Sequence, residues 1–204
     1  MDFEVNKPDE TTPEKKENNE NIFLGYLRDF TAVIVVVMLL FFLFFRIIVV
    51  SGPSMNDTLE HGDTLLLVSR VFYHDPKPGD IVVASKESFR DGEPIIKRII
   101  ATEGQKVDID FKTGEVYVDD VLLDESAYIK GSTINNPDLM KFPIIVKEGH
   151  VFVMGDNREN SRDSRSKDIG QIDERQILGK ALFLIFPGAD EDKAREYKRI
   201  GVLD

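Results

Sequence analysis

One serine stands in a segment that the sequence predicts to be a turn. Ser54 lies between Gly52-Pro53 and Met55-Asn56, and glycine followed by proline is typical of an ordinary turn. The segment is not the G-x-S-x-G turn of the α/β-hydrolases, because Asn56 occupies the place of the second glycine. A serine hydroxyl becomes a nucleophile when an adjacent base removes its proton, so Ser54 is of interest only if the chain also provides such a base.

A lysine stands within an apolar segment further along the chain. Side chains alternate along a strand, so in residues 94–100 Lys97 shares a face with Ile95 and Ile99, and Arg98 is on the other face. An exposed lysine at a sheet edge would only oppose aggregation. A lysine held among apolar side chains has a lowered pKa instead, and its neutral amine can accept a proton from a hydroxyl.

The third segment, residues 155–165, is densely polar and follows a short apolar run. As a solvated loop it would be ordinary, but its residues can fix one another. Asp163 and Arg165 are close enough in sequence to form an ion pair, and Asp156 and Asn157 can close the turn.

Other kinds of site have little support in the sequence. The three histidines, His61, His74 and His150, are scattered, and the chain contains no cysteine, which excludes a thiol nucleophile, disulfides and cysteine-bound metals. A Ser-His-Asp triad and a carboxylate dyad have no supporting motif. The net charge of −11 argues against a nucleic-acid partner. We therefore expect no metal, no cofactor and no nucleic acid.

The part of the chain that holds the three segments reads as β-rich. Short β-branched runs are separated by turn sequences, which predicts a mainly β fold, either a sandwich or a partly closed barrel. The polar composition of residues 190–199, near the end of the chain, predicts a short helix or a frayed end. The predicted strands are Thr64–Val68, Ile81–Ala84, Ile95–Ala101, Lys106–Asp110, Glu115–Val118 and Val151–Met154.

An apolar run of 21 residues, 30–50, precedes this part and is interrupted only by Arg46 near its end. A helix of about 20 apolar residues spans a bilayer, so we predict a transmembrane helix over 27–46, an acidic disordered tail over 1–26 and a catalytic domain over 47–204. A cleaved signal peptide would be shorter and would begin with basic residues.

The charges around this helix give its orientation. Lys15, Lys16 and Arg28 precede the run, whereas only Arg46 closely follows it. This mildly favours a cytoplasmic N-terminus and an extracytoplasmic catalytic domain.

The three segments, in this order after one membrane helix, resemble the type I signal peptidases. The family pattern is S-M-x-P-T-L, then K-R, then G-D-N-R-x-x-S-x-D-S-R. Gly79-Asp80-Ile81-Val82 also resembles a short family segment, and the resemblance covers nearly all of 30–187. The matching residues are Ser54, Met55, Thr58 and Leu59 in the first motif, Lys97 and Arg98 in the second, and Gly155, Asp156, Asn157, Arg158, Ser161, Asp163, Ser164 and Arg165 in the third.

The resemblance implies a role for individual residues. Ser54 would be the nucleophile, Lys97 the general base, and Ser161 the residue that orients the lysine amine. Asp163 and Arg165 would form a supporting ion pair. Met55 and Ile96 would shape the pocket for the small substrate residues.

Three departures from the family pattern stand out. Asp57 replaces a proline, which removes a rigid turn and adds a carboxylate three residues from Ser54. Glu103 and Gln105 replace residues of a P-G-D sequence, which we expect to change a loop and not the chemistry. Gly52 stands where some members carry a serine that donates to the oxyanion, so the second oxyanion donor is unassigned.

The function implied by the resemblance is the removal of N-terminal signal peptides from exported preproteins, with cleavage after small residues in an A-x-A-like site. Its partners would be preproteins and the lipid bilayer. One membrane helix and a compact catalytic part are more similar to Gram-positive bacterial members than to the two-helix kind. Three alternatives stay open: a specialised relative with few substrates, a catalytically silent relative that acts as a binding factor, and a self-cleaving Ser/Lys repressor.

Overall fold

The computed structural model describes residues 13–56, 58–87, 89–136, 138, 140–189 and 195–203. The chain divides into two compact units, Met1–Leu43 and Phe44–Asp204. The first contains nearly all of one helix, and the second contains all the strands, so each is described by itself.

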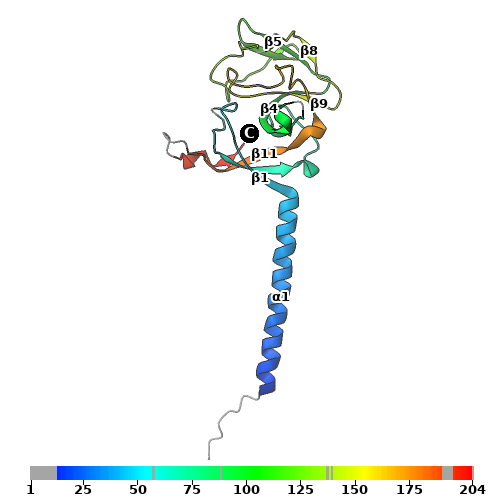
Figure 1. Cartoon of the computed structure of the whole chain (residues 1–204), viewed down its shortest axis with the longest axis vertical. Coiled ribbons are helices and arrows are strands. Elements are labelled where there is room, and N and C mark those ends of the chain that lie inside the picture. Colours follow the sequence, from blue (N-terminus) through cyan, green and yellow to red (C-terminus); the bar gives the residue numbers. More distant parts are fainter. Residues whose placement is uncertain are drawn as a thin grey trace, which may run out of the picture. The chain divides into compact units, whose positions relative to one another are not determined.

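The first unit is built on the helix α1, Pro13–Phe44 (Figure 1). Its segment Ile22–Phe44 has 23 residues and is strongly apolar. At 1.5 Å per residue this segment is about 35 Å long, which exceeds the hydrocarbon core of about 30 Å. Within the structure its large apolar side chains are exposed, as at Phe30 and Phe42. The segment is therefore long and apolar enough to cross a membrane.

The bounds of α1 differ from those predicted. The disordered tail was expected to extend over 1–26, but the helix begins at Pro13, while residues 1–12 lie outside the described residues. Glutamate and lysine are good helix formers, and extending a helix that already exists costs much less than nucleating one.

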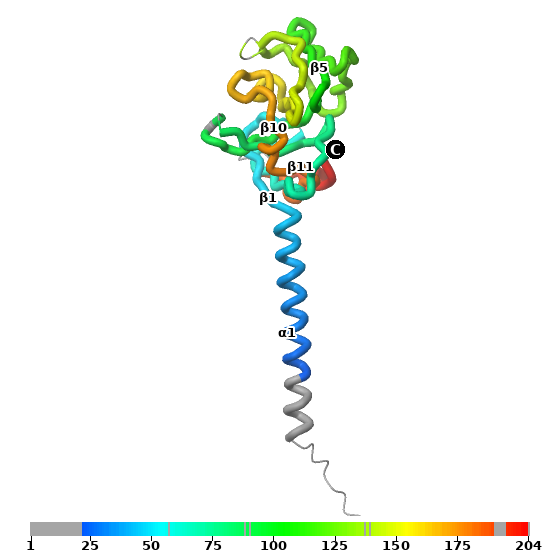
Figure 2. The backbone as a smooth tube through the Cα atoms, turned by 90° about the vertical axis from the view of Figure 1, so that its right-hand side faces the viewer, coloured from blue at the N-terminus to red at the C-terminus, as the bar shows by residue number. Residues whose placement is uncertain are grey.

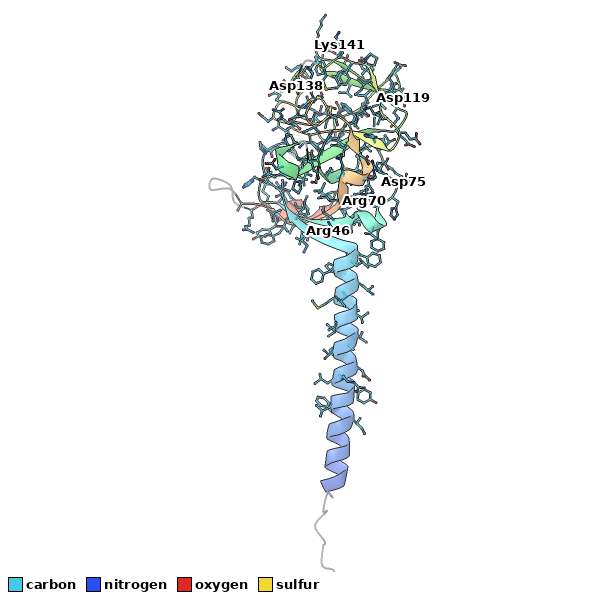
Figure 3. All side chains as sticks on the ribbon, turned by 45° about the vertical axis from the view of Figure 1, so that its right-hand side comes forward. Arg46, Arg70, Asp75, Asp119, Asp138 and Lys141 are labelled. Carbon is cyan, nitrogen blue, oxygen red and sulfur yellow. The ribbon has the colours of Figure 1, made fainter. Side chains whose placement is uncertain are left out.

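The predicted transmembrane helix over 27–46 also ends too late. The structure ends α1 at Phe44, and residues 45 and 46 belong to a strand, where Arg46 is paired with Leu67. Figure 3 labels Arg46 on this strand. The β-branched residues after Arg46 favour a strand, and pairing with a neighbouring strand provides the backbone hydrogen bonds.

The second unit contains a large antiparallel sheet of eight strands, in the order β1-β2-β11-β3-β4-β9-β10, with β12 paired to β11. This order is open at both ends. The bounds are β1 Phe45–Val49, β2 Thr64–Ser69, β3 Ile81–Ser85, β4 Pro94–Thr102, β9 His150–Met154, β10 Ile172–Asp173, β11 Ile177–Phe186 and β12 Gly201–Val202.

A smaller sheet is inserted between β4 and β9, which are neighbours in the large sheet. Its order, β7-β6-β5-β8, is also open. Figure 1 shows it beyond β4 and β9, and in both Figures 1 and 2 its strand β5 lies away from β1 and β11. The strands are β5 Lys106–Asp110, β6 Glu115–Val118, β7 Val121–Leu122 and β8 Ile144–Ile145, and the 3-10 turns of the unit are η1 Arg70–Phe72, η2 Arg90–Gly92, η3 Glu174–Gln176 and η4 Tyr197–Arg199.

The core explains why these runs form strands. In β2 the side chains alternate, with Leu65 and Leu67 fully buried between half-buried neighbours, which is the pattern of a strand with one buried face. In β4 the residues from Lys97 to Ala101 are all buried, because both faces of this strand are covered. A separate apolar cluster, which includes Phe152 of β9 and Val107 of β5, joins the two sheets.

The mainly β prediction is confirmed, and all six predicted strands are present within one or two residues. The turn at Asp119-Asp120 joins β6 to β7, and both residues are at positive φ, as in a type I′ hairpin turn. The sequence reading missed β11, the longest strand, because its ten residues are almost continuously apolar and do not alternate. Of the predicted polar helix or frayed end over 190–199, residues 190–194 lie outside the described residues, and Tyr197–Arg199 forms a short 3-10 helix.

Candidate active site

Ser54 lies on a loop that connects β1 to β2, here called the Ser54 loop (residues 50–63). Two backbone hydrogen bonds close its base, from Val50 N–H to Asp63 O at 2.8 Å and from Gly62 N–H to Val50 O at 2.9 Å. Met55, next to Ser54, is 1 % exposed and packs in the core with Leu59. This burial fixes the backbone at Met55, and Ser54 is left lining a cleft.

Lys97 meets this loop from the middle of the sheet. It lies on β4 opposite Val82 of β3 and is only 4 % exposed. Its Nζ donates to Ser54 Oγ at 2.7 Å and to Ile96 O at 2.9 Å. The structure therefore brings the two predicted catalytic residues into direct contact, although they are 43 residues apart.

The third motif forms a buried loop after β9, here called the polar loop (residues 155–166). Asp163 and Arg165 are both 0 % exposed and form the expected ion pair at 2.9 Å. Burial by itself raises the pKa of the Asp163 carboxyl, but the Arg165 guanidinium and the Gly155 N–H outweigh it and hold this pKa below its ordinary value. Asp163 is therefore an ionised carboxylate inside the protein.

Ser161 lies against the Ser54 loop. A Cβ atom added to Gly155 would lie 2.3 Å from Ser161 Oγ and 2.4 Å from Ser54 O, so only glycine lets these groups approach. The Ser161 hydroxyl is buried, and among the described residues it has no partner at hydrogen-bonding geometry. Its expected contact with the Lys97 amine thus stays a prediction.

Two residues of the polar loop hold the Ser54 loop from outside. Asn157 donates from its backbone N–H to Ser54 O at 3.1 Å and from Nδ2 to Pro53 O at 3.0 Å. Asp156 Oδ2 accepts from Thr58 Oγ1 at 2.6 Å. The first and third motifs are therefore parts of one assembly.

Asp156 also pairs with the residue that follows Lys97. Arg98 is 3 % exposed and donates to both Asp156 oxygens, at 3.0 and 2.9 Å. Its guanidinium lies 4.3 Å from the ring centre of Tyr128. As predicted from strand alternation, Lys97 and Arg98 point to different partners, one to the serine and one to a carboxylate.

The polar loop is tied to the region of the small sheet as well. Arg158 donates to Glu125 through both terminal nitrogens and to Thr133 Oγ1 at 2.6 Å. Burial by itself lowers the pKa of the Arg158 guanidinium. The hydrogen bond and ion pair with Glu125 raise this pKa by more than burial lowers it, so the net pKa is above the ordinary value. Glu125, Tyr128 and Thr133 were not found from the sequence, because nothing near them in the chain indicates a partner more than 20 residues away.

A cleft of about 530 Å³ opens beside Ser54 and Lys97. One wall is formed by residues 48–53 and another by residues 93–96. Both predicted pocket residues, Met55 and Ile96, line it, and Asn160 and Arg162 complete it. Apolar side chains such as those of Met55, Val83 and Ile96 form part of the lining, which suits small apolar substrate residues.

The residues that depart from the family pattern form hydrogen bonds within the part of the chain that the structure describes. Glu103 Oε2 accepts from Gly149 N–H at 2.8 Å, and Gln105 Oε1 accepts from Thr102 N–H at 2.9 Å. Both fasten turns, in line with a loop change. Gly52, at φ +87°, donates its N–H to His61 Nδ1 at 3.2 Å. Asp57 lies outside the described residues. The described residues contain no cluster of three or more His, Asp or Glu side chains placed to hold a metal.

Comparison with known proteins shows which family the chain belongs to. The family model "Signal peptidase, peptidase S26" matches residues 24–186. The chain therefore belongs to the S26 signal peptidases, a class of serine peptidases. Within this class its relatives are the type I enzymes, so it is a type I signal peptidase by family.

The similarity extends over most of the chain. It is 38 % identical over 148 residues to probable signal peptidase I-1 of Synechocystis sp., covering 69 % of this chain and 70 % of the relative. It is 30 % identical over 204 residues to signal peptidase I T of Bacillus subtilis, covering 92 % and 96 %. The crystal structure of an Enterococcus faecalis signal peptidase I is 29 % identical, with a TM-score of 0.41, over 52 % of this chain and 97 % of that one.

Proposed function

We propose that this chain removes signal peptides from exported preproteins, with Ser54 as the nucleophile and Lys97 as its general base. The observation that carries the proposal is the 2.7 Å contact between Lys97 Nζ and Ser54 Oγ at a buried lysine beside an open cleft. Burial disfavours the charged form of an amine, and only the neutral form can accept the serine proton.

The proposed reaction has two halves. Neutral Lys97 takes the Ser54 proton as Oγ bonds to the scissile carbonyl carbon, and the Ser54 backbone N–H stabilises the oxyanion. The C–N bond then breaks, and the leaving amine takes the proton from Lys97. Water then adds to the acyl carbon as Lys97 takes its proton, the C–Oγ bond breaks, and Lys97 returns the proton to Ser54 Oγ, which releases the carboxyl product.

The supporting residues have proposed roles of their own. Ser161 orients the lysine amine, and the Asp163–Arg165 pair holds the polar loop in place behind it. The substrate binds as an extended strand in the cleft, where Met55 and Ile96 favour the small side chains of an A-x-A-like site. The apolar residues in the lining of the cleft beside the serine support this specificity.

The proposed location is the cell membrane of a Gram-positive bacterium. Residues of the span Ile22–Phe44 anchor the chain in the bilayer, with the N-terminus in the cytoplasm and the domain that follows outside the membrane. Support comes from the span's length and from the near full-length match to Bacillus relatives. An anchor at the bilayer would bring the cleft close to membrane-bound preproteins.

The test is cleavage of a purified preprotein with an A-x-A site by the full-length chain in detergent. We expect Ser54→Ala and Lys97→Met to lower kcat/KM by about 10³-fold or more, with folding verified by thermal unfolding. The methionine fills the space of the buried lysine. The matched controls are Ser126→Ala and Lys112→Met, at exposed positions in the region of the small sheet, and both should cleave normally.

Each outcome has a distinct meaning. An active Ser54→Ala variant would show that another residue is the nucleophile. An active Lys97→Met variant would show that another base operates. A wild-type chain that cleaves no A-x-A preprotein would favour the specialised or the silent relative.

A further inference from the structure

A buried carboxylate stands at the base of the Ser54 loop. Asp63 is 0 % exposed, and it accepts from the backbone N–H of Glu60 at 2.8 Å and from that of Gly188 at 2.7 Å. Removing a carboxylate from water is costly unless a cation and hydrogen bonds replace the solvent. The Ser54 loop therefore depends on whatever supplies the positive charge.

That charge comes from the far end of the chain. Arg199 lies in η4 and its side chain is 16 % exposed. Its Nη2 donates to Asp63 Oδ2 at 2.6 Å and its Nη1 to Asp63 Oδ1 at 3.1 Å, which is the paired geometry that a guanidinium forms with a carboxylate.

The same guanidinium holds two more points of the loop. Nη1 donates to Glu60 Oε2 at 3.2 Å, and Nη2 donates to the backbone carbonyl of Thr58 at 3.3 Å. Thr58 is thereby held on two sides, because its hydroxyl donates to Asp156 of the polar loop. One side chain thus connects the base of the loop to its far side, four residues from Ser54.

Arg199 is itself delivered by an ordered segment. The strand β12 that follows it pairs with β11, Phe183 opposite Val202 and Leu184 opposite Gly201. Leu203 packs on the apolar cluster that contains Met55, the residue next to Ser54. Figure 2 shows this C-terminal end beside β11. The arginine is therefore fixed to the sheet that also carries Lys97.

We propose that Arg199 is a positioning residue for the peptidase reaction, which holds the Ser54 loop so that Ser54 Oγ stays within reach of Lys97 Nζ. The inference rests on the proposed function, since it needs Ser54 as the nucleophile. Arg199 does not line the cleft, so its loss should leave substrate binding intact. It should lower kcat instead, because a displacement of about 1 Å at a reacting group costs about 100-fold.

The test compares three variants of the full-length chain in detergent. Arg199→Gln removes the positive charge beside Asp63. Arg199→Lys keeps this charge but cannot form the paired hydrogen bonds of a guanidinium. Lys198→Gln is the matched control, because Lys198 lies in the same turn and pairs only with Glu196 at the surface among the described residues. Values of kcat and KM on an A-x-A preprotein are measured at a temperature well below the lowest unfolding midpoint of the variants. Ser54→Ala is measured in the same assay.

We expect kcat to fall by about tenfold or more in Arg199→Gln and by less in Arg199→Lys, with KM unchanged in both, and Lys198→Gln to match the wild type. If Arg199→Gln does not fold, Arg199→Lys still decides the question. A folded Arg199→Lys or Arg199→Gln variant with wild-type kcat, or a change in KM alone, would overturn the proposal and leave Arg199 a purely structural residue. Activity remaining in Ser54→Ala would instead refute the proposed function.

Discussion

The two loops that meet at the candidate active site are stabilised in different ways. The polar loop has one ion pair entirely within itself, between the fully buried Asp163 and Arg165, besides the buried pairs that join Asp156 to Arg98 and Arg158 to Glu125. The Ser54 loop has its base closed by its own backbone, but its side-chain anchors come from outside, from Asp156 at a separation of 98 residues and Arg199 at 136 or more.

The difference follows from what each loop faces. Most of the polar loop is buried, although Asn160 and Arg162 line the cleft, so it can enclose an ion pair of its own. The Ser54 loop lines the cleft, where a substrate must approach the serine, and its front must stay open. Its stabilising contacts therefore come from behind, and damage to them should change catalysis more than damage of equal size in the polar loop.

The largest effect is expected from breaking the internal pair of the polar loop. Arg165→Leu leaves the Asp163 carboxylate buried without its counter-charge, which should lower the free energy of unfolding by about 3–5 kcal/mol. The measurement is urea unfolding in detergent. The matched control is Arg175→Leu, because Arg175 also pairs with an aspartate two residues before it, but its side chain is 81 % exposed.

At this exposed pair the loss should be below about 1 kcal/mol. Equal losses in the two variants would contradict the view that burial makes the polar-loop pair important.

A smaller loss is expected when the same pair is disrupted by acid. The pKa of Asp163 is below its ordinary value of 3.8, so the folded chain binds a proton there less readily than the unfolded chain. The contribution is complete at a pH above the unfolded pKa and is lost as the pH falls through the lower, folded one. The loss is smaller than in Arg165→Leu, because protonated Asp163 keeps hydrogen-bond partners.

The measurement is the free energy of unfolding at several pH values between about 5 and 3. As the pH falls over this interval, the wild type should lose more stability than Arg165→Leu. In the variant no guanidinium opposes the effect of burial, so burial raises the Asp163 pKa. Parallel pH curves for the two proteins would show that Asp163 makes no such contribution.

The same contrast explains what was predictable from the sequence. Six of the strands and the Asp163–Arg165 pair follow from patterns within a few residues, and all of these are present. The family resemblance indicated Ser54 and Lys97, whose contact spans 43 residues. Arg199, His61 and Glu125 left no local signal, because each meets its partner only after the sheets have formed. The end of α1 at Phe44 was missed for the same reason, since pairing with β2 and not composition makes residues 45–49 a strand.

The smallest effect on stability, but a clear one on rate, is expected from breaking one outside contact of the Ser54 loop. Thr58→Val removes the 2.6 Å hydrogen bond to Asp156, while Asp156 keeps Arg98. The free energy of unfolding should fall by about 1.5 kcal/mol, and kcat by about tenfold, because the loop that carries Ser54 is less firmly placed.

Thr113→Val is the matched control: Thr113 donates to Glu115 at 2.9 Å on an exposed turn of the small sheet, so both quantities should stay near the wild-type values. If Thr58→Val lost stability but kept the wild-type kcat, the outside contacts would serve folding alone, and the two loops would differ in construction but not in their importance for catalysis.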